Sequence, residues 1–425
     1  MNDRNAVTDD DIQSVVDGFK HYIARAAETS SFDVEDMKNY MEPIFERAGF
    51  RSTRDGENKA HILLLHEAAA GDFVMMSAAI REIRRIYPTA YITLVVESRV
   101  ANLAECCPYI DDLIDVPFKT MPKTFTSIFD ADLKTAQQLL KRRFDLALAF
   151  AYSVVPNVPL LAYMSGAKRR VTHHGGLWEP LVTEFVPPII GKYQAIDVNL
   201  KYVEYLLGAP IVNREVEVWI DESDLESVKS MLPSAKKLCA IGLGGSFAKN
   251  HYPPEYYAEL MKMILRADGD VKFVLLGGST DIDDAKIVTA NVDPKCVVDL
   301  VGKTTFRQTT AALSFCELYI GNDTSAMHLA AATDTPVLNP NPLALDLHVF
   351  PNSRDHWTPR DVPSVIVCPS HALPECRGST DFRGCRFDYP HCITQITPQN
   401  LFDAYKILLE RSERGIKQPL IVGAK

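Results

Sequence analysis

A polar turn near residue 320 carries side chains that could bind a phosphate group. Residues 316–320 form an apolar run typical of a buried strand, and a helix pattern begins at Ser325. Asp323 and Thr324 lie between them, and His328 follows one helical turn later. The unpaired N–H groups and the dipole of a helix N-terminus favour phosphate binding. The alternative is an ordinary N-cap, with Asp323 or Thr324 capping the helix and no ligand bound.

Three further turns after apolar runs contain glycine or charged residues. Glycine lets the backbone approach a phosphate closely, and a lysine supplies a mobile positive charge. Each turn alone is weak evidence, since glycine pairs often mark plain turns and a lone lysine is usually solvated. Together the turns predict a diphosphate site, with Asp281 placed for ribose hydroxyls. The candidates are Gly71 and Asp72; Gly245, Ser246 and Lys249; Gly278 and Asp281; and Asp323, Thr324, Ser325 and His328.

The composition and the missing motifs exclude several other functions. The formal net charge is −10 over 425 residues, which argues against a nucleic-acid-binding protein because phosphate contacts need a basic surface. No Gly-x-Gly-x-x-Gly opens a domain and no Gly-x-x-x-x-Gly-Lys-Ser/Thr occurs, so dinucleotide oxidoreduction and P-loop hydrolysis lose support. No apolar run reaches about 18 residues, so we expect any membrane contact to be peripheral.

The cysteines indicate a reducing compartment and suggest a metal site. There are nine, an odd number, and the polar N-terminus lacks a signal-peptide core, so we expect reduced thiols in the cytoplasm. Four thiolates can bind Zn or Fe tetrahedrally. The four cysteines nearest the C-terminus are spaced more widely than Cys-x-x-Cys, so four reduced thiols without a metal are the alternative. The candidate ligands are Cys368, Cys376, Cys385 and Cys392.

Strands alternate with helices over two long stretches of the chain. Residues 61–65 and 91–96 are typical of strands, with a helix pattern between them, and the same order restarts after Val212. This alternation predicts βαβ units and parallel sheets, in which ligands lie outside the carboxyl ends of the strands. All four turns lie at such ends. The fold class is therefore α/β, with two domains of about 150 residues each that face one another across a cleft.

The predicted boundaries leave additional segments at both ends. Two amphipathic helices in the first segment cannot bury their apolar faces alone, so they pack on the body or build a homo-oligomer. The predicted divisions are a helical extension at 1–57, α/β domains at 58–212 and 213–397 (the second including the cysteine-rich loop 368–392), and a C-terminal helix and tail at 398–425.

Five blocks of sequence follow one another in a fixed order, at residues 62–88, 244–255, 277–281, 299–313 and 321–332. Their order and spacing are far more specific than any one block. Together they resemble glycosyltransferase family 9, the heptosyltransferase family, and the resemblance covers roughly residues 60–412. It implies the GT-B architecture, two facing Rossmann-like domains, of which the first binds the acceptor and the second binds the nucleotide sugar.

The resemblance also implies a mechanism. The donor is a nucleotide diphosphate sugar, ADP-heptose in the best-known members, and Asp72 matches the family's general base. Transfer is a single displacement with inversion at the anomeric carbon. Lys249, Thr324, Ser325 and the helix N-terminus would stabilise the leaving diphosphate, so catalysis needs no metal. Asp281 matches a position where the family usually has Glu, which shortens its reach to the ribose.

Two departures from the family pattern support a rival reading. Ser325 stands where the family usually has glycine, and residues 338–342 replace a Phe-Gly-Pro segment that shapes the donor pocket. The added N-terminal helices support the same reading. A non-catalytic sugar-nucleotide-binding or scaffold protein that keeps the fold is therefore the alternative. A GT-B epimerase is a third reading, but its additional catalytic carboxylates and histidines cannot be located in the sequence.

The acceptor is not specified by the sequence. The family default is the lipopolysaccharide core, and a protein serine or another surface glycan or glycolipid is the alternative. Two basic clusters, 141–143 and 168–170, either contact anionic saccharide or lipid head groups or are ordinary solvated faces.

Overall fold

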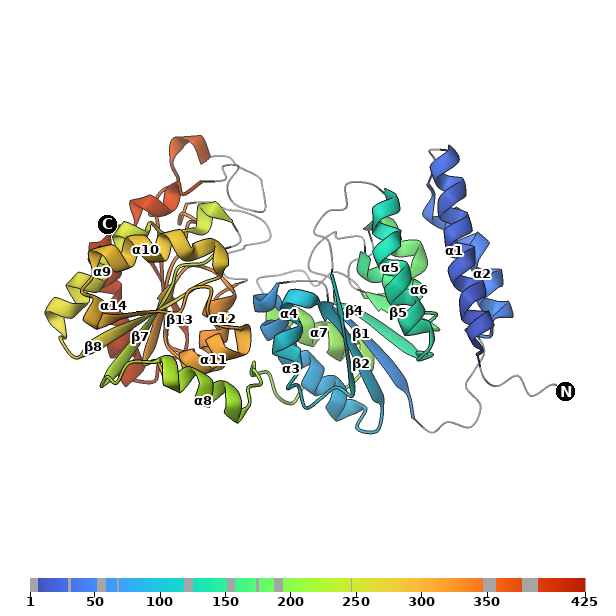
Figure 1. Ribbon diagram of the computed structural model, residues 1–425, viewed down its shortest axis with the longest axis horizontal. Coiled ribbons are helices and arrows are strands. Elements are labelled where there is room, and N and C mark those ends of the chain that lie inside the picture. The colour runs from blue at the N-terminus through green and yellow to red at the C-terminus, as the bar shows by residue number, and fades with distance from the viewer. Residues whose placement is uncertain are drawn as a thin grey trace. The chain divides into compact units, whose positions relative to one another are not determined.

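The computed structural model divides into two compact units, which we describe separately (Figure 1). Unit 1 contains residues 1–69, 79–190 and 199–213, and unit 2 contains residues 70–78, 191–198 and 214–425. The start of helix α3 (Ala70–Ile86) and the start of α7 (Ala195–Leu207) thus belong to unit 2. The structure describes residues 7–29, 32–51, 59–66, 69–117, 125–150, 157–172, 176–186, 194–245, 247–346, 357–376 and 389–424.

Unit 1 is built on a parallel sheet of six strands in the order β3-β2-β1-β4-β5-β6. Leu64 in the middle of β1 pairs with Leu94 on one side and Leu148 on the other. Buried residues run almost without a break along β1, β2 and β4, as expected for a parallel sheet covered on both faces. The strands are β1 (His61–His66), β2 (Tyr91–Glu97), β3 (Asp112–Val116), β4 (Leu146–Phe150), β5 (Arg169–Thr172) and β6 (Glu184–Phe185).

The two N-terminal helices form part of the core of unit 1. Phe19 of α1 and Phe45 of α2 each meet the Tyr163 ring edge to face, with ring centroids 6.2 and 5.3 Å away. The body of the same chain therefore covers the apolar faces, one of the two outcomes that the sequence allowed. The helices of this unit are α1 (Asp9–Thr29), α2 (Val34–Arg47), α4 (Ser98–Ala104), α5 (Phe125–Leu140), α6 (Asn157–Met164) and the 3₁₀ turn η1 (Gly176–Leu181), besides most of α3 and α7.

Charged groups fasten the helical pair to the sheet. Burial by itself would raise the pKa of Glu42, but its two hydrogen bonds from Arg51 hold that pKa below the ordinary value. Arg170 is buried and donates to the carbonyl oxygens of Ala167 and Leu181, and burial lowers the pKa of its guanidinium to about 10. Arg51 also donates to the Gly166 carbonyl oxygen at 3.0 Å, which joins the segment after α2 to the turn before β5.

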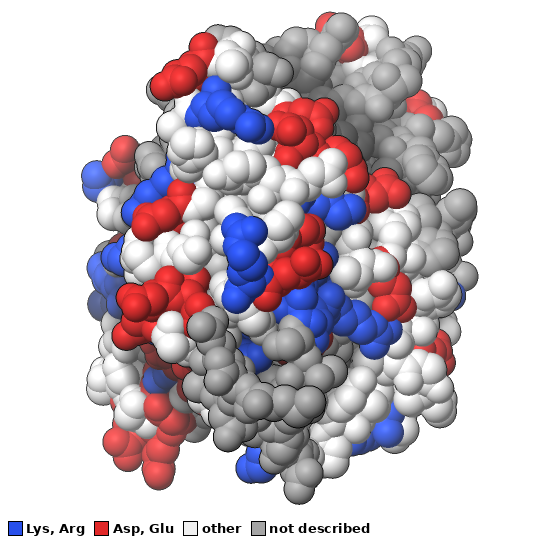
Figure 2. Space-filling model, turned by 90° about the vertical axis from the view of Figure 1, so that its right-hand side faces the viewer, with Lys and Arg blue, Asp and Glu red and all other residues white. Residues whose placement is uncertain are grey.

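The two predicted basic clusters bind their own chain. Arg169 pairs with Glu184 at 2.7 Å, and Arg142 pairs with Asp112 at 2.6 Å. Arg170 is buried, and all three arginines stabilise the fold through contacts within the chain. The hypothesis that the clusters bind an anionic acceptor therefore gains no support. On the face drawn in Figure 2, Lys and Arg side chains lie interspersed with Asp and Glu.

Unit 2 is built on a parallel sheet of seven strands in the order β13-β12-β11-β10-β7-β8-β9. Gly242 at the end of β7 pairs with Gly321 of β10 and Leu276 of β8, so the chain leaves all three strands at the same edge. The strands are β7 (Lys237–Gly242), β8 (Val271–Leu276), β9 (Val297–Asp299), β10 (Leu318–Gly321), β11 (Val337–Pro340), β12 (Ser364–Cys368) and β13 (Pro419–Gly423).

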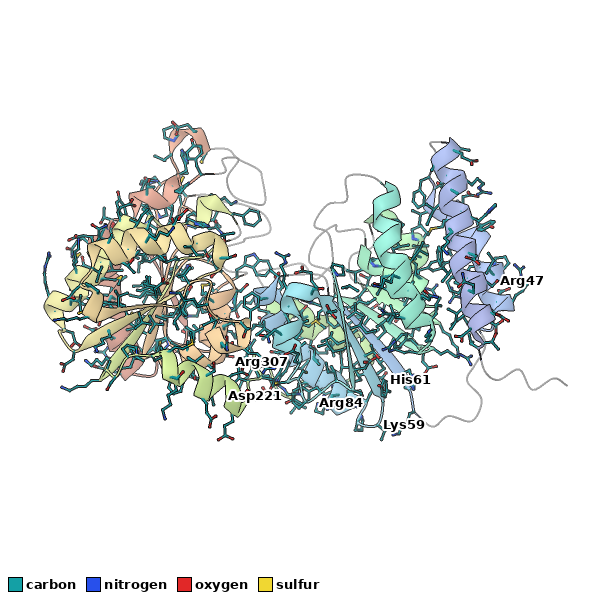
Figure 3. The ribbon with its side chains drawn as sticks, in the orientation of Figure 1. Arg47, Lys59, His61, Arg84, Asp221 and Arg307 are labelled. Carbon is teal, nitrogen blue, oxygen red and sulfur yellow. The ribbon has the colours of Figure 1, made fainter. Side chains whose placement is uncertain are left out.

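Helices and short 3₁₀ turns connect these strands. Arg307 at the start of α11 pairs with Asp221 and Asp224 at the start of α8, with N···O distances of 2.9 and 2.7 Å (Figure 3). Among the described residues, no helix combines the length and the apolar character needed to cross a membrane. The connecting elements are α8 (Glu222–Met231), η2 (Ala248–Asn250), α9 (Pro254–Ala267), η3 (Ser279–Asp281), α10 (Ile282–Asn291), η4 (Pro294–Cys296), α11 (Phe306–Ser314), α12 (Ser325–Ala332), η5 (Pro374–Cys376), η6 (Cys392–Gln395) and α14 (Pro398–Glu413).

The packing of the helical pair predicts its contribution to stability. Phe45 is fully buried, so Phe45→Ala should lower the free energy of unfolding by about 3–5 kcal/mol. Urea denaturation followed by circular dichroism measures this. Lys20→Ala removes an exposed side chain from α1 and should change stability by less than about 0.5 kcal/mol. Equal stability of the two variants would show that the helical pair is only loosely attached.

Candidate functional site

The turn between β10 and α12 (residues 321–325, the β10–α12 turn) presents an uncapped helix N-terminus. Thr324 occupies the N-cap position with extended backbone, but its side chain makes no capping hydrogen bond. Its hydroxyl instead interacts with the phenol of Tyr319. The structure therefore differs from the ordinary N-cap that the sequence left open. A helix N-terminus without a side-chain cap leaves backbone N–H groups that can bind an anion.

The buried side chain of Asn322 holds this turn in place. Its Oδ1 accepts hydrogen bonds from the Tyr252 N–H at 3.0 Å and the Tyr257 hydroxyl at 2.8 Å. Its Nδ2 donates to the carbonyl oxygens of Leu243 at 2.7 Å and Gly244 at 3.1 Å. One amide thus joins the β10–α12 turn to the loop after β7 (residues 243–250, the β7 loop). No role for Asn322 was predicted from the sequence, where the available signal was a polar residue directly after a buried strand.

Close contact between the strand ends requires glycine. The Tyr319 hydroxyl lies against the backbone of Gly242 and Gly321, and a Cβ atom on either residue would overlap it. Larger residues at these two positions would therefore push the β7 loop and the β10–α12 turn apart.

Opposite charges lie together at the base of the site. Lys249 on η2 is buried, with 8% of its surface exposed, and its Nζ lies 5.7 Å from the centroid of the Phe247 ring. Burial raises the pKa of Asp323 to about 6, although the positive charge of Lys249 opposes this shift. The buried ammonium of Lys249 and the easily protonated carboxyl group of Asp323 can together accommodate the negative charge of a ligand.

The other two glycine turns are held by their own side chains. His251 Nε2 lies 2.9 Å from the Gly245 carbonyl oxygen, and a Cβ on Gly245 would come within 2.8 Å of the His251 ring. The carboxylate of Asp281 accepts a 2.7 Å hydrogen bond from the Gly278 N–H and is 3% exposed. Asp281 thus holds its own turn in this structure, and its predicted contact with a ribose stays a prediction. Ser246 lies outside the described residues.

The start of α3 lies against the β10–α12 turn within unit 2. The Gly71 N–H donates to Ser325 Oγ at 3.0 Å, and a Cβ on Gly71 would approach the His328 ring to 2.9 Å. Ser325, the unexpected residue at a glycine position, thus supplies an acceptor for the N-terminus of α3. Asp72 follows Gly71 in the first turn of that helix and is partly exposed.

His328 is a neutral imidazole in this environment. Burial lowers its pKa from 6.5 to about 4, and the residue is 7% exposed. The structure therefore brings Gly71, Ser325 and His328 into contact, and it places Lys249 close enough to Asp323 to influence its ionisation.

Comparison with known proteins shows which family this chain resembles. The model of glycosyltransferase family 9 (heptosyltransferase) matches residues 133–339. Lipopolysaccharide heptosyltransferase 2 of Salmonella typhimurium is 23% identical over 367 residues, which cover 84% of this chain and 99% of the relative. The lipopolysaccharide core heptosyltransferase OpsX of Haemophilus influenzae is 23% identical over 65% of this chain and 77% of its own length.

The chain is similar to glycosyltransferase family 9 over these residues. The family 9 structure from Veillonella parvula matches with a TM-score of 0.68 at 17% identity, covering 84% of this chain and 99% of the other. Heptosyltransferase II of Escherichia coli matches with a TM-score of 0.63 at 19% identity, covering 83% and 99%. The expected GT-B fold is confirmed, and this protein is a glycosyltransferase.

This glycosyltransferase also contains a cluster of side chains that could bind a metal ion, outside the four polar turns. Cys376, His391 and Cys392 place their ligand atoms within 4.8 Å of one another, and His391 Nδ1 lies 3.3 and 3.5 Å from the two sulfur atoms. Ligands of tetrahedral zinc lie about 3.6 Å apart, given Zn–S near 2.3 Å and Zn–N near 2.1 Å. The donors thus fit zinc or iron in chemistry and spacing.

The structure describes three of the four predicted ligands, and two of them, Cys376 and Cys392, belong to this group. Cys368 is the last residue of β12, is fully buried and is not part of the group. His391, which was not predicted as a ligand, belongs to the group, and its position beside Cys392 was the available signal. Cys385 lies outside the described residues.

The bonding of Asn322 predicts a large effect on stability. Asn322→Leu would leave two donors and two carbonyl groups in the core without their partner, so it should cost at least about 3 kcal/mol of unfolding free energy. Urea denaturation measures the loss. Asn291→Leu changes an exposed amide that bonds only within its own helix, and it should cost less than about 0.5 kcal/mol. Similar values for both variants would contradict the role of Asn322.

The low pKa of His328 predicts a dependence of stability on pH. The folded state favours the neutral ring, so the contribution of His328 is complete above pH 6.5 and is lost as the pH falls towards 4. Between pH 7 and 5, the wild-type protein should lose about 2 kcal/mol more unfolding free energy than His328→Gln. Urea titrations at both pH values measure the difference, and parallel losses in the two proteins would count against a buried neutral ring.

Proposed function

We propose that this enzyme transfers heptose from ADP-heptose to a hydroxyl group of a cell-surface glycan, with the lipopolysaccharide core as the preferred acceptor. The uncapped N-terminus of α12 beside the buried Lys249 carries the proposal, because it offers donors for a diphosphate. The names of the relatives support the sugar and the acceptor. A protein hydroxyl is the second acceptor class.

In the proposed reaction Asp72 acts as the general base. The acceptor oxygen attacks the anomeric carbon while Asp72 takes its proton, and the bond from that carbon to the phosphate oxygen breaks. The product has inverted configuration and the nucleoside diphosphate leaves. Asp72 directly follows Gly71, which is hydrogen-bonded to Ser325, so the base lies next to the turn that would bind the donor. Such a base typically contributes about 10²–10⁴-fold to the rate.

The leaving diphosphate would gain negative charge at the N-terminus of α12. Lys249 and the N–H groups of the first helical turn supply positive potential there, so the chemistry itself needs no metal. Thr324 and Ser325 add hydroxyl groups, and Ser325 keeps its own O–H for donation while its oxygen accepts from Gly71. Asp323, with its pKa raised to about 6, can donate a hydrogen bond to a sugar or phosphate oxygen when it is protonated.

The remaining assignments follow from the same reasoning. Residues 58–212 would bind the acceptor and residues 213–397 the nucleotide sugar. Cys376, His391 and Cys392 would hold a structural zinc or iron ion.

We further propose that the enzyme works in the cytoplasm, peripherally at the inner membrane where its lipid-linked acceptor would lie. The apolar faces of α1 and α2 are covered within the chain. Assembly of a homo-oligomer through residues 1–57 stays a prediction.

The decisive test removes the base and keeps the donor site. Asp72→Asn should reduce transfer from ADP-heptose at least about 10²-fold, while the affinity for ADP measured by calorimetry stays within about twofold. Transfer is followed by mass spectrometry of the acceptor, and Asp283→Asn, at an exposed position on α10, is the control. Turnover by Asp72→Asn at the wild-type rate would show that the base lies elsewhere.

Two of the three observations behind the non-catalytic reading have a structural role in the site. Ser325 makes a specific hydrogen bond, and Asn339 in the rewritten segment 338–342 donates to the Gly321 carbonyl oxygen at 2.9 Å. Both departures therefore support the β10–α12 turn. Incubation with ADP-, UDP- and GDP-sugars would separate the readings, because binding without transfer or slow hydrolysis of any donor would favour the scaffold.

A further inference from the structure

The cluster of Cys376, His391 and Cys392 is built from segments that lack long stretches of regular structure. Two of its members belong to the 3₁₀ turns η5 and η6, and His391 precedes the second of these. Turns of this kind hold their shape poorly by themselves. Metal ligation would fix three side chains at once and transfer that rigidity to whatever packs against them.

We propose that this cluster, when it holds a metal ion, positions both the β7 loop and the β10–α12 turn. It would thereby set the affinity of the enzyme for its donor. The inference relies on the proposed function only for the identity of that ligand. The two routes from the cluster to the turns do not depend on the proposed function.

The first route leads to Lys249. The turn η6 begins at the ligand Cys392 and packs against η2, the turn that carries Lys249. Ile393 and Ile396 of the same segment are fully buried in one core cluster with Tyr252, three residues after Lys249. A shift of Cys392 would therefore move the support beneath the lysine.

The second route begins at the segment after β11. Cys376 and Cys392 pack against Ala344 and Ala372 in a small separate cluster. The Ala372 N–H donates to the Asp346 carboxylate at 2.7 Å, and the Leu345 N–H donates to the Pro369 carbonyl oxygen at 2.9 Å. The cluster and the adjoining segment 369–372 thus hold residues 344–346 in place.

From there hydrogen bonds continue to the β10–α12 turn. The Leu343 N–H donates to the side chain of Asn341, whose Nδ2 lies 3.4 Å from Asn339 Oδ1. Asn339 in turn donates to the carbonyl oxygen of Gly321, the first residue of the β10–α12 turn. The two routes therefore reach the lysine and the helix N-terminus that would bind the same diphosphate.

The test compares Cys392→Ser with the matched control Cys296→Ser, a partly exposed cysteine in unit 2 that lies outside the cluster. Metal content is measured by mass spectrometry, backbone mobility by hydrogen exchange, and ADP affinity by calorimetry. Cys392→Ser should lose the metal, exchange faster at residues 247–252 and 321–328, and bind ADP at least about tenfold more weakly. Cys296→Ser should match the wild-type protein in all three measurements.

Chelation removes the metal without a substitution. Treatment of the folded wild-type protein with phenanthroline should reproduce faster exchange in the same two segments, and added Zn²⁺ or Fe²⁺ should restore slow exchange. Loss of the metal with unchanged exchange in both segments would overturn the proposal, as would a wild-type protein that neither contains nor takes up metal. If wild-type protein does not bind ADP at all, the proposed donor is wrong, and the exchange data alone decide the role of the cluster.

Discussion

The arrangement of the site depends on one buried amide. Asn322 bonds to two backbone carbonyl oxygens, one backbone N–H and one phenol, so it uses its donors and its acceptor inside the core. These bonds cannot be exchanged for bonds to water without opening the ends of β7 and β10. Because a buried polar group is costly when its partners are missing, the turns beside Asn322 have essentially one low-energy arrangement. The helix N-terminus and Lys249 are both adjacent to this junction.

The titratable groups of the site lie in less favourable surroundings than Asn322. Burial raises the pKa of Asp323 and lowers that of His328, and Lys249 is buried as well, so three titratable groups lie where solvation is poor. Such an environment lowers stability in the absence of a ligand, and it strengthens the interaction with an anionic ligand. Rigid hydrogen bonding around Asn322 lets the fold tolerate these poorly solvated titratable groups.

The sequence predicted the parallel sheets and the polar turns because apolar runs that end in glycine or charged residues are a local signal. It could not reveal the role of Asn322, whose partners lie 65 to 79 positions away in the chain. Short strands were also missed, since β6 has two residues and β11 contains Asn339 and Pro340. Cys368 was grouped with the other cysteines because spacing alone cannot show that β12 encloses it.

The strand β13 has a protective role at the edge of unit 2. Ser364 to Cys368 of β12 pair with Pro419 to Gly423 of β13, and Leu420 and Val422 pack against the core. Without β13, the fully buried strand β12 would present a row of unpaired N–H and C=O groups along an apolar edge. Such edges recruit strands from other molecules. Strand β13 therefore protects this edge from aggregation. A chain that lacks β13 would self-associate through β12 even with its donor site intact.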